Sequence, residues 1–163
     1  FLPLQCIMIP LAVLVRDLHI SNTLWAVIVP YIAFNISFAV MVIYGYMRSL
    51  PYELEESACI DGASLWTCFI KVIVPNVKSA ISTVVIFVFM NVWNEYNLAL
   101  VLLNRDAIKT LPLGMIFFKG EHTTDWGAMG ATMVIASIPT IIIYILFSAQ
   151  VEKAMTVSGA VKG

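Results

Sequence analysis

Long apolar stretches without charge constrain this chain more than any other feature of its sequence. The run from Ile20 through Met47 contains no Asp, Glu, Lys or Arg, and 61% of the 163 residues are hydrophobic while only 12% are charged. Soluble domains carry charge on about a quarter of their residues, whereas a bilayer-crossing helix needs about 20 apolar ones. The sequence therefore predicts an all-α integral membrane protein built as a helical bundle.

Apolar stretches of this kind recur along the chain. We expect about four transmembrane helices, over residues 1–15, 24–47, 79–103 and 127–151, in a single domain that covers residues 1–163. The first stretch is short for a complete span and lacks the basic start of a signal peptide, so we expect N-terminal sequence to be missing. The nine Lys and Arg divide almost evenly between the two sides, so they do not set the orientation.

Composition and motifs exclude several function classes. A net charge of −1 without a basic face argues against nucleic-acid binding, and three widely spaced cysteines argue against a disulfide framework or a metal site. The phosphate-binding pattern G-x-x-x-x-G-K-[ST] is absent from the sequence. A membrane enzyme or an ion-coupled carrier needs several polar or ionisable groups within its spans, and the expected spans offer Glu95 alone.

The polar segment between the second and third expected spans predicts two short helices joined by a turn. Pro51 followed by three glutamates is typical of a helix start, because proline needs no amide partner there and carboxylates favour the positive end of the helix dipole. Gly62 predicts the stop, since glycine adopts the left-handed conformation at little cost, and Ser64 can cap the second helix. Pro75 should push Val74 out of helical geometry and end that helix.

The second of these helices carries an apolar stripe at helical spacing, made of Leu65, Trp66, Phe69, Ile70 and Ile73. An amphipathic segment can rest in the lipid interface, and an Asp-Gly pair can be an ordinary surface turn. Three acids within four residues suit anionic lipid poorly. We therefore favour a docking element that fits a groove of another protein.

The spacing in this segment resembles the EAA loop of bacterial ABC importer permeases, whose pattern is E-A-A, three residues, G, nine residues, I-x-L-P. Glu56-Ser57-Ala58 is followed by three residues and Gly62, then by nine residues and Val72-Ile73-Val74-Pro75. Ser57, Val72 and Val74 depart from the pattern with small changes in volume. Further segments resemble the carbohydrate-type, maltose-permease-like branch over nearly the whole chain: Trp93-Asn94-Glu95-Tyr96, Thr110–Gly114, Asp125–Gly127 and Gly159–Gly163.

The resemblance implies the C-terminal part of a sugar-importer permease with about six spans of about 20 residues each. Its loop, residues 51–75, would be cytoplasmic and would sit in a cleft of a separate ATPase subunit dimer that binds ATP and Mg, leaving this chain without a cofactor. Other implied partners are a second permease subunit, an extracytoplasmic solute-binding protein and membrane lipid. The resemblance also places the chain in the bacterial cytoplasmic membrane, with its C-terminus on the cytoplasmic side. The implied coupling residues are Glu55, Glu56, Ser57, Ala58, Asp61, Gly62 and Pro75. Among them, Glu56 is expected to pair with a basic group of the ATPase cleft and Ala58 to pack closely beside it. Gly62 is expected to set the angle between the two helical arms.

Polar residues of the third expected span are candidates for the translocation path. Asn91, Asn94 and Glu95 recur at helical spacing and so share one face, with Trp93 beside them. An ionisable side chain within a span is a functional candidate because its isolated burial is expensive, but polar side chains also link helices. For these residues a structural or gating role and a role in the translocation path therefore both stay open. The transported solute could also be a small molecule other than a sugar.

Overall fold

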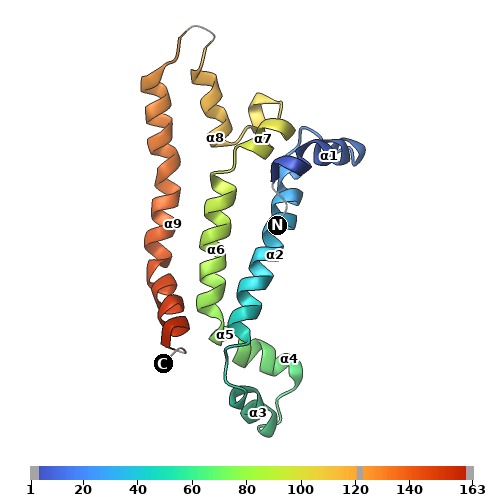
Figure 1. The fold of residues 1–163 in the computed structure, drawn as a ribbon, viewed down its shortest axis with the longest axis vertical. Coiled ribbons are helices and arrows are strands. Elements are labelled where there is room, and N and C mark those ends of the chain that lie inside the picture. Colours follow the sequence, from blue (N-terminus) through green and yellow to red (C-terminus); the bar gives the residue numbers. More distant parts are fainter. Residues whose placement is uncertain (1–3, 121–122, 161–163) are drawn as a thin grey trace. The chain divides into compact units, whose positions relative to one another are not determined.

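Helices make up the regular structure of the computed structural model, which describes residues 4–120 and 123–160 (Figure 1). The α-helices are α1 Leu4–Asp17, α2 Trp25–Met47, α3 Glu53–Ile60, α4 Leu65–Cys68, α5 Val74–Asn76, α6 Lys78–Trp93, α7 Asn97–Leu102, α8 Leu111–Gly114 and α9 Trp126–Ala160. A π-helical turn, η1 Phe69–Ile73, and two 3₁₀ turns, η2 Asp106–Ile108 and η3 Met115–Phe118, complete them. The predicted all-α class is confirmed.

Two helices are long and apolar enough to cross a bilayer: α2, and the part of α9 from Trp126 to Ser148. The segments Leu65–Asn76 and Lys78–Trp93 meet the same criterion as a pair, bent by 66° where they join. By length and composition the described residues thus hold two or three spans, fewer than the four expected. Helix α1 has 14 residues, short of the about 20 that a span needs, and a first span at 1–15 stays a prediction.

The chain forms two compact units, of which the first comprises Phe1–Phe34 and Met90–Ile142. Helix α1 contacts α7 within it. Its core buries apolar side chains of α1, α2, α7 and the following turns, namely Val15, Ala26, Val27, Leu98, Ala99, Leu102, Leu103 and Leu113. This core fixes the short helices that follow α6.

The second unit comprises Asn35–Phe89 and Ile143–Gly163. In it α3 and α4 form a helical hairpin beside the last turns of α2 and the first turns of α6 (Figure 1). The buried residues of this hairpin core are Ala58, Cys68, Ile73 and Val77, and side chains of α2 and α6 pack against them, including Tyr46, Met47 and Ile81. The hydroxyl of Ser79 also donates to that of Tyr46 at 3.1 Å. The loop is therefore a folded element attached to both helices.

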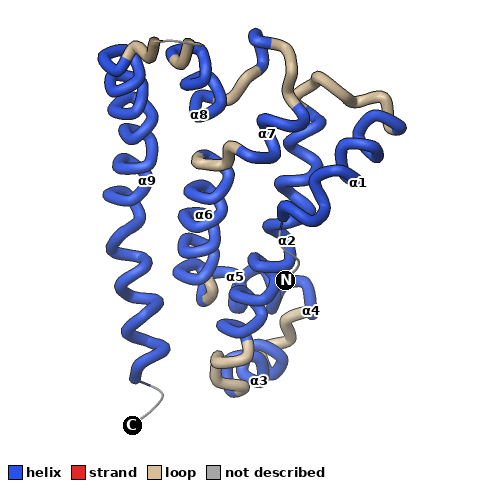
Figure 2. The backbone as a smooth tube through the Cα atoms, turned by 45° about the horizontal axis from the view of Figure 1, so that its top comes forward, coloured by secondary structure: helices blue, strands red, loops and turns tan. Residues whose placement is uncertain are grey.

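The third expected span, residues 79–103, is interrupted, and Figure 2 shows the loop that separates α6 from α7. After α6 ends, the side-chain amide of Asn94 donates to the carbonyl of Met90 at 2.8 Å. The carboxylate of Glu95 accepts from two backbone N–H groups in the first turn of α7, at 2.7 and 3.1 Å. These bonds satisfy the carbonyl end of one helix and the amide end of the next, so the prediction of one continuous helix was wrong.

Pro75 does not end the second arm at Val74, contrary to the prediction. Val74 is helical, with φ −56° and ψ −44°, and the helix continues to Asn76 before Val77 leaves helical geometry at φ −91°, ψ 7°. In the π-helical turn before the proline, the N–H of Val74 donates to the carbonyl of Phe69, five residues back. This wider register accommodates a residue that has no N–H to donate, and it overrides the extended preference of the residue before a proline.

Replacing Glu95 with alanine should destabilise the first unit, because the two bonds to α7 and a third from the Tyr31 hydroxyl, at 2.7 Å, would be lost. We expect the free energy of unfolding to fall by about 2 kcal/mol, the upper end for a lost helix cap. Thermal melts of the purified protein in detergent measure this. Asn91→Ala is the matched control, since Asn91 is exposed on α6, and equal melting temperatures for the two variants would contradict the capping role.

Candidate functional site

The first arm of the hairpin, α3, is a short acidic helix. Glu53, Glu55 and Glu56 lie in its first turn, where the positive end of the helix dipole favours carboxylates. These three residues and Asp61 are exposed, and none of them takes part in an ion pair within the described part of the chain. Four unpaired carboxylates on one small element favour a partner with basic groups.

Gly62 joins the two arms as the sequence predicts. Its φ of +78° lies in the left-handed region. Its N–H donates to the carbonyl of Cys59 at 3.0 Å, and the N–H of Ala63 donates to the carbonyl of Ala58 at 3.0 Å. These are the two bonds of a Schellman motif, which ends a helix and reverses the chain. A Cβ at Gly62 would meet no atom within 4 Å, so the backbone conformation alone favours glycine here.

The second arm begins at Ser64, which is confirmed as its N-cap. Ser64 is extended, with φ −68° and ψ 160°, and its hydroxyl accepts from the N–H of Thr67 at 3.3 Å. The next two side chains are almost fully solvent-exposed, Leu65 at 86% and Trp66 at 75%. The rings of Trp66 and Phe69 meet edge to face, with centroids 6.3 Å apart. A rigid aromatic and aliphatic surface of this kind is typical of protein docking sites.

The remaining predicted coupling residues divide between the inside and the outside of the hairpin. Ala58 is 8% exposed and packs in the hairpin core, so it holds the two arms together and presents no surface. Ser57 is exposed and its hydroxyl donates to the carbonyl of Leu54 at 3.1 Å. Pro75 is exposed where the second arm approaches α6. Ile73, expected on the apolar stripe, is buried in the hairpin core.

The helix face expected to carry Asn91, Asn94 and Glu95, with Trp93 beside it, is interrupted, because α6 ends at Trp93. Asn91 is exposed on α6. The indole N–H of Trp93 donates to the carbonyl of Ala136 in α9 at 2.9 Å. Glu95 uses both carboxylate oxygens within the first unit, for Tyr31 and for the amides of α7. This geometry supports the structural role for Glu95 that the sequence left open.

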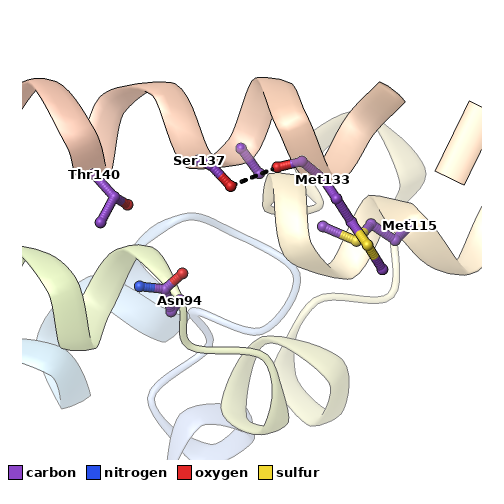
Figure 3. A pocket seen from close by; sticks show the side chains of 6 residues that line it. Asn94, Met115, Met133, Ser137 and Thr140 are labelled. Carbon is purple, nitrogen blue, oxygen red and sulfur yellow. Dashed lines mark hydrogen bonds between the residues drawn. The ribbon is translucent and has the colours of Figure 1, made fainter. Parts of the chain in front are cut away.

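Asn94 lines a cavity of about 260 Å³ in the first unit (Figure 3). The other lining residues come from η3 and one face of α9: Met115, Met133, Ala136, Ser137 and Thr140. Apart from Asn94, none of these residues was predicted from the sequence. Hydroxyl side chains in apolar helices usually bond to carbonyls of their own helix, and only the neighbouring proline at position 139 marks this turn as irregular.

The described residues contain no group of three His, Cys, Asp or Glu side chains arranged to hold a metal ion. Cys59 is exposed on α3 and Cys68 is buried, and both are free thiols. The chemistry available at the hairpin is therefore docking through charge and apolar contact. The chemistry available at the cavity is hydrogen bonding by uncharged groups.

Comparison with known proteins places these features in a family. A family model described as "Binding-protein-dependent transport system inner membrane component" matches residues 1–157. The chain is 34% identical to a multiple sugar-binding transport system permease protein of Streptococcus mutans, over 99% of this chain and 58% of the relative. It is 31% identical to a sulfoquinovosyl glycerol transport system permease protein of Agrobacterium fabrum, over 99% and 56%. It is 32% identical to a diacetylchitobiose uptake system permease protein of Streptomyces coelicolor, over 94% and 52%.

The chain thus spans about half the length of the curated relatives it matches. The matched part includes the whole helical hairpin and the cavity of the first unit. Both sites therefore lie inside the region that matches the family model.

Gly62→Ala should destabilise the protein by about 1–2 kcal/mol, the cost of placing an L-residue in the left-handed region. Gly45→Ala is the matched control, because Gly45 is helical in α2 and a Cβ there also meets no atom within 4 Å. Alanine is the better helix former, so the control should be neutral or slightly stabilising. Thermal melts compare the two, and equal effects would rule out the strained turn.

Proposed function

We propose that this chain, which belongs to the family of binding-protein-dependent transport system inner membrane components, is a sugar-translocating permease subunit of an ATP-driven importer. Family membership makes it a membrane transport component and not itself an enzyme. The relatives are named for multiple sugars, sulfoquinovosyl glycerol and diacetylchitobiose. Because these solutes differ, their names support carbohydrates as a class and leave another small solute as the weaker alternative.

The folded hairpin is the observation that carries the proposal. Its two arms are closed by a Schellman turn, and its core includes residues that follow directly into α6. A displacement applied to such a hairpin reaches the ends of α2 and α6 without being absorbed by a flexible loop. We infer that ATP-driven closure of a partner ATPase moves the hairpin and, through it, the transmembrane helices.

The surface of the hairpin supports a protein partner rather than lipid. Leu65 and Trp66 alone would suit the apolar side of a membrane interface. The same small element carries four carboxylates that form no ion pair with the residues the structure describes, and anionic headgroups repel them. A cleft that is apolar at its base and basic at its rim satisfies both sets of side chains.

Individual residues then take distinct roles. Glu56 pairs with a basic group of the ATPase, and Trp66 fills an apolar pocket of its cleft. Ala58 and Gly62 fix the angle between the arms from inside the hairpin. Pro75, with the π-helical turn before it, forms the joint to α6.

The remaining parts of the importer follow from the same proposal. ATP and Mg are bound by the ATPase dimer, and a second permease subunit completes the pore in the cytoplasmic membrane. The hairpin and the C-terminus then lie on the cytoplasmic side. The connection between α7 and α9 faces an extracytoplasmic solute-binding protein.

Trp66→Ala and Glu56→Ala should each weaken co-purification of the cognate ATPase subunit. We expect about tenfold or more for Trp66→Ala, since buried tryptophan anchors dominate interface energies, and a smaller loss for Glu56→Ala at the rim. Pull-down with tagged ATPase at a series of concentrations measures the affinity.

Two matched controls separate docking from general damage. Trp126 is as exposed as Trp66, at 75%, and Asp17 is an exposed acid paired with Arg16; their alanine variants should retain the ATPase. If Trp66→Ala and Glu56→Ala both retained the ATPase and supported normal ATP-driven uptake, the coupling proposal would be contradicted.

A further inference from the structure

We propose that the cavity beside Asn94 binds one ring of a neutral sugar, with the hydroxyl of Thr140 as its principal anchor. The proposal rests on the sugar-importer function above and assigns part of the solute path to this subunit. It follows from one hydroxyl whose usual hydrogen bond is missing.

Hydroxyl side chains in the helices of this chain regularly donate to the carbonyl four residues back. Such bonds are made by Thr83 at 3.0 Å, Thr132 at 2.9 Å and Ser137 at 2.8 Å. Thr140 departs from the pattern: its hydroxyl oxygen is buried and has no hydrogen-bond partner within the described part of the chain. A buried hydroxyl without a hydrogen-bond partner is unfavourable, so its persistence at a cavity wall favours a partner that arrives from outside the chain.

Trp93 explains why Thr140 lacks its usual acceptor. The carbonyl four residues before Thr140 belongs to Ala136, and it accepts the indole N–H of Trp93 at 2.9 Å. Pro139 lies inside this turn of α9; its missing N–H and bulky ring open the preceding turn to donors from other elements. Trp93 is therefore a positioning residue, because it occupies the carbonyl and leaves the threonine hydroxyl free.

The other polar groups at the cavity carry no charge. The amide nitrogen of Asn94 donates one of its two hydrogens to the carbonyl of Met90, so its second N–H and its amide oxygen can still bond to a ligand. The hydroxyl of Ser137 donates to the carbonyl of Met133, as Figure 3 shows, so its oxygen remains available as an acceptor. Sugar hydroxyls donate to such acceptors.

The same lining disfavours charged ligands. None of the lining side chains is ionisable, so a charged ligand would leave water without an opposite charge to compensate it. The side chains of Met115 and Met133 suit the C–H faces of a sugar ring, since the thioether is polarizable and adaptable.

The volume limits how much of a sugar the cavity holds. At about 260 Å³ it is slightly smaller than the about 300–1,000 Å³ typical of small-molecule sites. One pyranose or furanose ring fits this space, and an oligosaccharide would place one residue here while the rest lies elsewhere.

Calorimetric titration of the assembled importer tests the proposal. The probes are D-glucose, D-galactose, D-xylose and N-acetylglucosamine, with D-glucuronate and D-glucosamine as charged counterparts. At least one neutral sugar should bind, and the charged counterparts should bind about tenfold more weakly or worse. Thr140→Val should weaken the neutral sugar about tenfold, while Thr140→Ser should retain it.

Trp93→Phe supplies a readout that a purely structural role would not give. Without the indole, the Thr140 hydroxyl can donate to Ala136 and is no longer free, so sugar affinity should fall as in Thr140→Val. The double variant should then bind no more weakly than either single variant. Thr132→Val is the matched control, because that hydroxyl already bonds its own helix, and it should leave affinity unchanged.

Several outcomes would overturn the proposal. Equal affinity in wild type and Thr140→Val would do so, as would additive losses in the double variant. An importer that holds its ATPase but binds none of the neutral sugars would remove this site while leaving the transport function intact. Failure of the chain to assemble with any ATPase would overturn the transport function and the sugar site together.

Discussion

Where a helix is broken inside a bilayer, no water is present to bond to its free N–H and C=O groups. In the first unit, side chains take the place of that water. Glu95 supplies both carboxylate oxygens where α7 begins, and the Tyr31 hydroxyl holds that carboxylate from α2. Trp93 supplies its indole N–H to α9 beside a proline. The polar side chains of this segment therefore hydrogen-bond to backbone N–H and C=O groups. Only the polar groups that these bonds leave without a partner are available to a solute.

The hairpin follows the same rule at the end of the helices. Its orphan carbonyls are met by the N–H groups of Gly62 and Ala63, and the hydroxyl of Ser64 meets an amide of the second arm. Because the backbone is satisfied internally, side chains of both arms remain free to face a partner. The result is a small rigid body whose inner residues set its shape and whose outer residues carry charge and apolar surface.

The parts of the structure that depend on neighbours in sequence were predictable, and those that depend on distant partners were not. Gly62 and Ser64 act through amides within a few residues, so their roles could be predicted from spacing. Glu95 was expected on a helix face, but its partners include a tyrosine 64 residues away. Thr140 was not singled out, because its freedom depends on Trp93. The prediction that Pro75 ends the second arm at Val74 was wrong, because the π-helical turn before it changes the local hydrogen-bond register.

Docking of the hairpin into an ATPase can be measured directly with the natural cysteines. Cys59 is exposed on α3, while Cys68 is buried in the hairpin core and serves as an internal reference. The measurement is the rate of maleimide labelling at each cysteine, resolved by mass spectrometry, in the permease alone and in the assembled importer. Docking predicts that Cys59 is labelled in the permease alone and protected in the importer, with Cys68 unreactive in both. Equal labelling of Cys59 in the two states would contradict it.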